Sequence, residues 1–212
     1  MKDSRRSIIS WALYDWANSA FATTVMAAFF SIFFSSYWSL NQDSGLTTFW
    51  LGIANSVESL IVAVLAPMLG AVADCGGYRK KFLVFFSFLG ALLTGCLGMV
   101  HAGGWIAAMF IYVIACVGFA GANIFYDALL PVVASEKKVD FVSALGYSLG
   151  YIGGGLLFLV NVLMYLFPGV FGLSTTDSGV QAVKASFIMV ALWWIVFTLP
   201  LIFFVKDDAG KS

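Results

Sequence analysis

Histidine, cysteine and charged side chains are scarce in this sequence. Of its 212 residues, one is histidine, three are cysteine and 10% are charged. Cys75, Cys96 and Cys116 form no CxxC pair and show no zinc-ligand spacing with His101. The sequence therefore predicts no metal site, no cofactor and no disulfide framework, and we interpret the cysteines as small apolar side chains.

Two further absences limit the function. The formal net charge is zero, with 11 basic and 11 acidic residues, and no basic patch is present that would attract nucleic acid. No HExxH motif occurs, and no lysine lies in the middle of an apolar run, where a retinal Schiff base would require it. We therefore expect neither an enzyme nor a nucleic-acid-binding protein.

Apolar residues dominate the chain. Hydrophobic residues make up 61% of it, and the mean hydropathy is +0.96. A soluble domain of this size could not bury so much apolar surface, so we expect the solvent to be the lipid bilayer. A hydrocarbon core about 30 Å thick needs roughly 20 apolar residues per helix. The sequence predicts an all-α membrane protein with one bundle of six transmembrane helices over residues 1–212, at 10–38, 48–73, 82–100, 105–130, 141–167 and 183–205.

Basic residues are confined almost entirely to one side of these spans. Both termini and the connections at 74–81 and 131–140 hold ten of the eleven lysines and arginines, and only Lys184 falls on the other side. Short loops rich in lysine and arginine stay in the cytoplasm. Both termini are therefore expected to be cytoplasmic.

Polar side chains inside the spans are the candidates for function, because they are costly to place in lipid. Glu58 is the deepest charge and has no basic residue at its own depth, which makes it a candidate for proton coupling. The alternative is that Glu58 stays protonated and only hydrogen-bonds a neighbouring helix. The candidate proton or substrate pathway comprises Asp15, Asn18, Glu58, Asn123, Tyr147 and Asn161.

Small residues recur every fourth position in the fifth span, at Gly146, Gly150 and Gly154. This spacing is typical of a helix that another helix approaches closely, although contact with a substrate is an alternative. Tryptophan residues near the span ends are interpreted as an aromatic belt at the membrane interfaces. They are Trp11, Trp16, Trp38, Trp50 and Trp105.

The connection after the second span carries a recognisable pattern. The segment Gly70-Ala-Val-Ala-Asp74-Cys-Gly-Gly77-Tyr-Arg79-Lys-Lys resembles the loop signature of the major facilitator superfamily. The resemblance implies a cytoplasmic gating cluster of Asp74, Arg79 and an acid at the end of the fourth span, Asp127. Charges at a helix mouth pair when the mouth closes and separate when it opens. The alternative is a basic loop that only sets the topology.

Two more segments, residues 11–24 and 143–155, are similar to the vacuolar effluxer family of that superfamily, which includes fungal autophagy-linked amino-acid exporters. The resemblance implies a secondary transporter that moves a small solute, such as an amino acid, by alternating access. Glu58 adds the expectation of proton coupling, and the protein is expected in a bacterial cytoplasmic membrane. Because the superfamily has twelve spans, the chain would need a second six-helix half, from another chain or a homodimer. The alternative is a truncated, non-transporting half that packs against or regulates another membrane protein.

Overall fold

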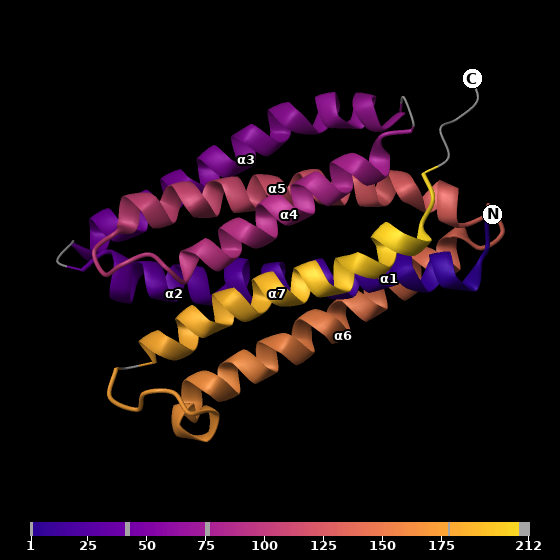
Figure 1. Ribbon diagram of the computed structural model, residues 1–212. Coiled ribbons are helices and arrows are strands. Elements are labelled where there is room, and N and C mark those ends of the chain that lie inside the picture. Colours follow the sequence, from indigo (N-terminus) through magenta and orange to yellow (C-terminus); the bar gives the residue numbers. More distant parts are fainter. Residues whose placement is uncertain (1, 41–42, 75–76, 178, 208–212) are drawn as a thin grey trace.

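The computed structural model describes residues 2–40, 43–74, 77–177 and 179–207 (Figure 1). Throughout these ranges the regular structure is helical and contains no strand. The elements are α1 (Arg5–Ala20), η1 (Phe21–Phe29), α2 (Phe30–Phe33), η2 (Phe34–Trp38), α3 (Ser44–Asp74), α4 (Arg79–Leu97), α5 (Trp105–Val133), α6 (Val139–Leu166), η3 (Pro168–Phe171) and α7 (Val180–Phe204).

Six helical spans are long and apolar enough to cross a membrane, if the continuous stretch Arg5–Trp38 is counted as one. A helix satisfies all of its backbone polar groups internally, which lipid requires. Proline lies inside α3, α5 and α7, at Pro67, Pro131 and Pro200. The predicted fold class, an all-α membrane protein with six transmembrane helices, is confirmed.

Both ends of the described chain lie at the same end of the bundle (Figure 1). The end of α3, the start of α4 and the α5–α6 connection lie there too, whereas the segment with η3 lies at the opposite end. This end therefore gathers the basic segments of the chain, and their cytoplasmic location stays a prediction from the sequence.

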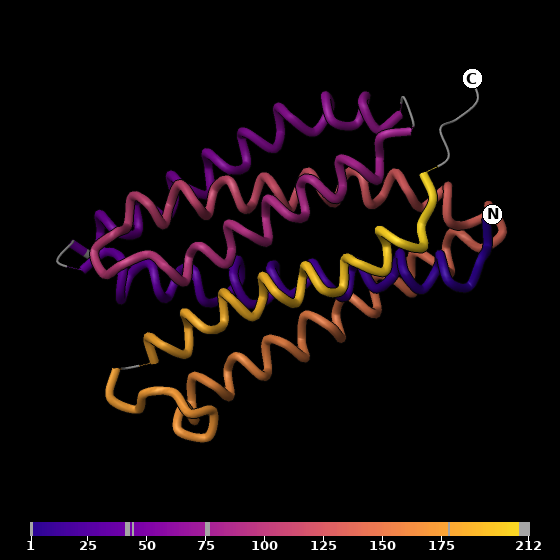
Figure 2. Tube along the Cα trace, viewed as in Figure 1, coloured from indigo at the N-terminus to yellow at the C-terminus, as the bar shows by residue number. Residues whose placement is uncertain are grey.

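The helices form one path of neighbours, in the order α3, α5, α4, α7, first span and α6 (Figure 2). If span one is exchanged with span four, span two with span five and span three with span six, the same path of neighbours results, read in the opposite direction. The two triplets run in opposite directions, since each contains an odd number of spans. The fold therefore has the contact pattern of an inverted three-plus-three repeat, which the sequence does not reveal on inspection.

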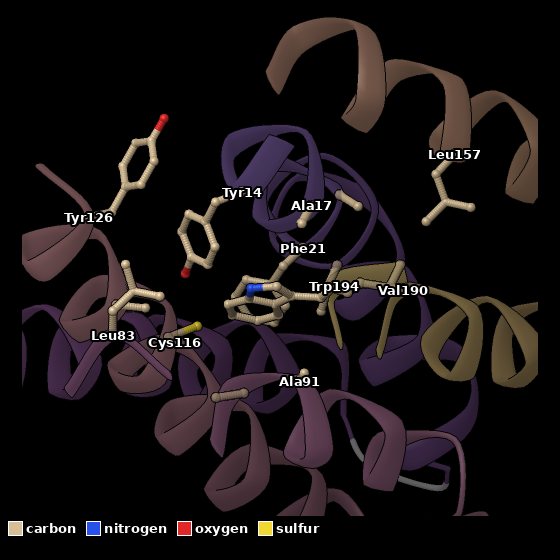
Figure 3. Packing of buried hydrophobic residues seen from close by; sticks show 14 of the residues in the cluster. Tyr14, Ala17, Phe21, Leu83, Ala91, Cys116, Tyr126, Leu157, Val190 and Trp194 are labelled. Atoms are coloured by element: carbon tan, nitrogen blue, oxygen red, sulfur yellow. The ribbon is translucent and has the colours of Figure 1, made fainter. Parts of the chain in front are cut away.

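Aromatic side chains fill the centre of the bundle. Figure 3 shows Phe21 beside Trp194. Their ring centroids are 5.6 Å apart, and the ring centroid of Phe119 is 5.4 Å from that of Phe21. Beside them, Gly90 and Gly118 bring α4 and α5 together, because a Cβ on Gly118 would lie 2.8 Å from the Gly90 Cα. In lipid such close contact between helices, rather than the hydrophobic effect, holds them together.

The cysteines conform in part to the expectation of small apolar side chains. Cys116 is buried in the core and Cys96 is partly exposed. Cys75 lies outside the described residues. No group of three metal-ligating side chains occurs within the ranges given above.

The first span changes its winding at Phe21. Two π-helical segments, η1 and η2, follow α1, and in them the backbone N–H of Phe30 donates to the carbonyl of Val25. Side chains beyond Phe21 therefore do not follow the 100° spacing of an α-helix. Trp38, at the end of this span, is fully buried, so its interpretation as a belt residue is wrong.

Candidate functional site

A polar recess opens between α1, α5 and α6 in the half of the bundle nearest the termini. Its volume is about 240 Å³. Seven side chains line it, of which four belong to the predicted site residues. The lining is formed by Trp11, Asp15, Asn123, Tyr126, Asp127, Ser143 and Tyr147.

Glycines on α6 allow the recess to form. A Cβ on Gly150 would lie 2.8 Å from Asp15 Oδ2, and one on Gly146 would lie 2.7 Å from the Tyr126 hydroxyl. Gly154 contacts the backbone of Ser19 in the same way. All three predicted glycines thus lie against α1 and its neighbours, and two of them make room for polar groups of the recess. They contribute to packing and to the shape of the site together.

Hydrogen bonds hold the floor of the recess. The side-chain amide of Asn18, which is buried, donates to Asn123 Oδ1 and joins α1 to α5. Asp15 accepts a 3.3 Å hydrogen bond from Ser19 Oγ, one turn further along the same helix. The pair Asn18–Asn123 links α1 to α5, and Asp15 lies against Gly150 of α6.

Aromatic rings form one wall. Trp11 stacks on Tyr126 with the ring centroids 4.2 Å apart, and its indole N–H donates to the Tyr126 carbonyl at 3.1 Å. Trp11 is only 2% exposed, so it belongs to this wall and not to an interfacial belt, and that interpretation is wrong for Trp11 as well. On α6, the hydroxyls of Tyr147 and Tyr151 lie 2.9 Å apart on the open side.

Glu58 lies apart from the recess, on α3. It is half-buried, and Ser59 Oγ donates to its carboxylate at 3.3 Å. Tyr112 and Cys116 of α5 lie near it. Tyr112, Cys116 and Asn123 share one face of α5. Glu58 of α3 therefore lies beside a part of α5 that is about two to three helical turns away from Asn123 and the recess. The predicted role in proton coupling stays a prediction.

Asn161 is buried in the seam between α6 and the first span. Its amide donates to Thr24 Oγ1 at 3.4 Å, and its Oδ1 has no partner. It lies about three helical turns beyond Gly150 on α6, outside the recess lining. Its place in a solute pathway therefore also stays a prediction.

Four of the five predicted gating residues lie near the turn between α3 and α4, and the fifth, Asp127, does not. Gly77 has φ +73°, a conformation that favours glycine and turns the chain into α4. Arg79 Nε donates to the Ala73 carbonyl at 2.7 Å, and Asp74 is exposed. Asp127 lies at the recess, and a side chain on Gly70 would meet no atom.

No ion pair joins Asp74, Arg79 and Asp127 within the described ranges, where the one pair within 4.0 Å is Lys138–Asp3. Lys80 from the same loop has a separate role. Its ammonium donates to the carbonyls of Ile202 and Val205 at 3.0 and 2.9 Å and so caps the end of α7, where the helix dipole is negative.

The N-terminus is tied to the α5–α6 connection at this end. Asp3 Oδ1 accepts a 3.0 Å hydrogen bond from the backbone N–H of Ser135, and Lys138 Nζ lies 4.0 Å from Oδ2. This hydrogen bond above all, with the charge of Lys138, holds the pKa of Asp3 below its ordinary value of 3.8. The carboxylate thus joins the start of the first span to the end of α5.

One buried hydrogen bond next to the site was not predicted from the sequence. Tyr14 donates or accepts a 2.8 Å hydrogen bond with Ser87 of α4, and only its position one turn before Asn18 signals it.

The residues Gly146 to Gly150 match the letters of the hydrolase motif GxSxG. Ser148, however, lies within helix α6 and donates to the Ala144 carbonyl at 2.7 Å, so it has neither the turn nor the base of a nucleophile.

Comparison with known proteins places these features in one family. The profile of the family described as "Vacuole effluxer Atg22 like" matches residues 43–140 and 133–212. An uncharacterized MFS-type transporter, YxiO, of Bacillus subtilis is 37% identical over 206 residues, which cover 95% of this chain and 47% of the relative. Autophagy-related protein 22 of Pichia angusta is 26% identical over 74% of this chain and 31% of its own length.

An uncharacterized protein of Aquifex aeolicus is 28% identical over 73% of this chain and 38% of its own length. No solved structure matches. The chain spans less than half the length of the curated relatives named here. It is a multi-pass membrane protein of the vacuole effluxer Atg22-like family, within the major facilitator type of transporters.

Proposed function

We propose that this chain forms one six-helix half of a secondary transporter, which moves a small solute across a bacterial cytoplasmic membrane by alternating access. The observation that carries the proposal is the polar recess, because its side chains would be costly against lipid and serve only a face that meets water or solute. The family of the chain and the MFS-type relative in Bacillus subtilis support both the activity and the membrane.

A second six-helix bundle would complete the transport path. Helix α3 contacts mainly α5, and its residues Asn55 and Ser59 are exposed. Tyr147 and Tyr151 on α6 are also exposed, at 63% and 64%. Polar side chains on both outer helices of the path favour a protein neighbour over lipid at this face. The partner would be a second copy or a separate half.

The solute class proposed is amino acids, which follows from the family resemblance. To test it, the chain is extracted from its own membrane and the native mass and every copurifying chain are determined. It is then reconstituted in liposomes that contain a radiolabelled amino-acid mixture. Efflux that depends on the protein, from a complex with a second bundle, supports the proposal. A monomer without flux contradicts it and favours the alternative, a half that packs against another membrane protein.

Proton coupling through Glu58 is proposed as part of the mechanism. Glu58→Gln removes the titrating group and keeps its shape, so it should abolish transport driven by a pH gradient and leave solute exchange intact. Glu136→Gln, an exposed acid in the α5–α6 connection, is the matched control. Uphill transport at the original rate in Glu58→Gln would remove this residue from the coupling step.

A further inference from the structure

The recess between α1, α5 and α6 holds negative charge with no positive charge opposite it. Asp15 and Asp127 both line it, and none of its seven lining residues is lysine or arginine. Neither acid takes part in an ion pair in the part of the chain that the structure describes, where Lys138 and Asp3 form the one pair within 4.0 Å. The recess therefore attracts cations and repels anions.

The carboxylate of Asp15 has unused hydrogen-bonding capacity. A carboxylate offers about four acceptor positions, and Asp15 uses one of them, in the long 3.3 Å hydrogen bond from Ser19. The residue opposite, Gly150, has no side chain to cover Oδ2, whereas a Cβ at that position would lie 2.8 Å from this oxygen. A group with several N–H donors would meet these free positions.

An unpartnered hydroxyl provides a second, independent observation. Tyr126 is 6% exposed, and its buried hydroxyl has no hydrogen-bond partner. That hydroxyl lies against Gly146 of α6, between the positions of Ser143 and Tyr147, which both line the recess. A buried hydroxyl without a partner is costly, so a donor from outside the chain would satisfy it.

The aromatic wall selects the kind of cation. Trp11, Tyr126 and Tyr147 line the same recess, and the faces of such rings attract ammonium groups. A hard metal ion, in contrast, needs about six oxygen ligands, and the described residues contain no group of three histidine, cysteine, aspartate or glutamate side chains. Rings beside two carboxylates suit an organic amine.

We infer that this recess binds the ammonium group of an amine-bearing organic solute, with Asp15 as its hydrogen-bonding anion and the rings of Trp11, Tyr126 and Tyr147 around it. The carboxylate of an amino acid finds no positive side chain here, so the ammonium group alone is recognised in this half. The inference rests on the proposed function for the solute's passage, whereas binding is measured without transport.

A matched pair of probes tests the inference on the unaltered chain in lipid nanodiscs. The first probe, 3-methylbutylamine, carries an ammonium group, and the second, 4-methylpentanoate, carries a carboxylate on the same branched alkyl group. Titration calorimetry should detect the amine and not the acid. Asp15→Asn should weaken binding of the amine about tenfold or more, since hydrogen bonds to charged groups are strong. Asp140→Asn, an exposed acid in the first turn of α6, should leave it unchanged.

Each result decides the inference. Absence of amine binding, equal binding of both probes, or an amine affinity that Asp15→Asn leaves unaltered would overturn it. If Asp15→Asn does not fold, the comparison of the two probes on the unaltered chain still decides. Amine binding without flux in liposomes contradicts the proposed function and leaves the inference intact. Flux that the acid inhibits as strongly as the amine supports transport and overturns the inference.

Discussion

The seam between α1 and α6 can be tested with two glycines of α6 that lie two positions apart. A Cβ on Gly153 would lie 2.5 Å from Trp16 Cδ2 and 2.6 Å from the Trp16 carbonyl oxygen, whereas a Cβ on Gly155 would meet nothing within 4 Å. The side chain of Trp16 could rotate away, but its carbonyl belongs to the backbone of α1. Gly153→Ala must therefore push the two helices apart.

The two substitutions are expected to change the free energy of unfolding in opposite directions. Overpacking of a tight contact costs about 1–3 kcal/mol of the free energy of unfolding. Alanine in place of an exposed helical glycine adds about 0.5–1 kcal/mol of stability, because glycine loses more backbone entropy on folding. We expect Gly153→Ala to be less stable than Gly155→Ala by about 1.5–4 kcal/mol.

The assay is equilibrium unfolding in mixed micelles with increasing dodecyl sulfate, followed by tryptophan fluorescence. Since Trp16 lies at the altered contact, its emission should also change in Gly153→Ala before unfolding begins. Gly155→Ala is the control for any effect of alanine on helix propensity. Equal midpoints for the two variants would refute the close approach of α1 to α6.

Three further predictions concern other contacts. Asn18→Ala and Asn123→Ala should show a coupling of about 0.6–1.5 kcal/mol in a double-mutant cycle of unfolding, as expected for a hydrogen bond between helices, and additive effects would exclude the bond. The pKa of Asp3 in the folded chain is lowered chiefly by the hydrogen bond that its carboxylate accepts from the backbone N–H of Ser135. The contribution of Asp3 to the free energy of unfolding is therefore present above pH 3.8 and is lost as the pH falls through the lowered pKa of the folded state. Asp3→Asn should flatten the stability profile in that acidic range, and an unchanged profile would contradict the assignment. Arg79→Ala should open the cytoplasmic mouth, so that a cysteine at Ser143 is labelled faster from that side, and unchanged labelling would leave the loop as a topology signal.

The number of spans could be predicted from the sequence because each span meets lipid on its own. Every helix must be apolar enough for the bilayer whatever its neighbours are, so hydropathy reveals it locally. The stripe of Asp15 and Asn18 followed from helical spacing for the same reason. That Asn123 of α5 is the partner of Asn18 depended on which helices pack together, and spacing within one helix contains no such information.

Side-chain directions were harder to predict than depths. Tryptophan near a span end indicates depth in the membrane, but Trp11 and Trp38 face the core and not the lipid. Trp38 follows the π-helical segment that begins at Phe21, where side chains do not keep their α-helical spacing. The inverted repeat was missed because it preserves contacts between helices, and these do not require similar residues.

Helix α3 contacts mainly one neighbour, α5, and this gives the bilayer a structural role of its own. With 31 residues it is about 46 Å long, against a hydrocarbon core about 30 Å thick. A helix longer than the core accommodates by tilting, and packing resists the tilt only where neighbours exist. For this chain alone, before a second bundle covers α3, acyl chain length therefore sets the angle of α3 more than that of any other span. In thin membranes α3 would lean furthest, and Glu58 would move with it relative to α5.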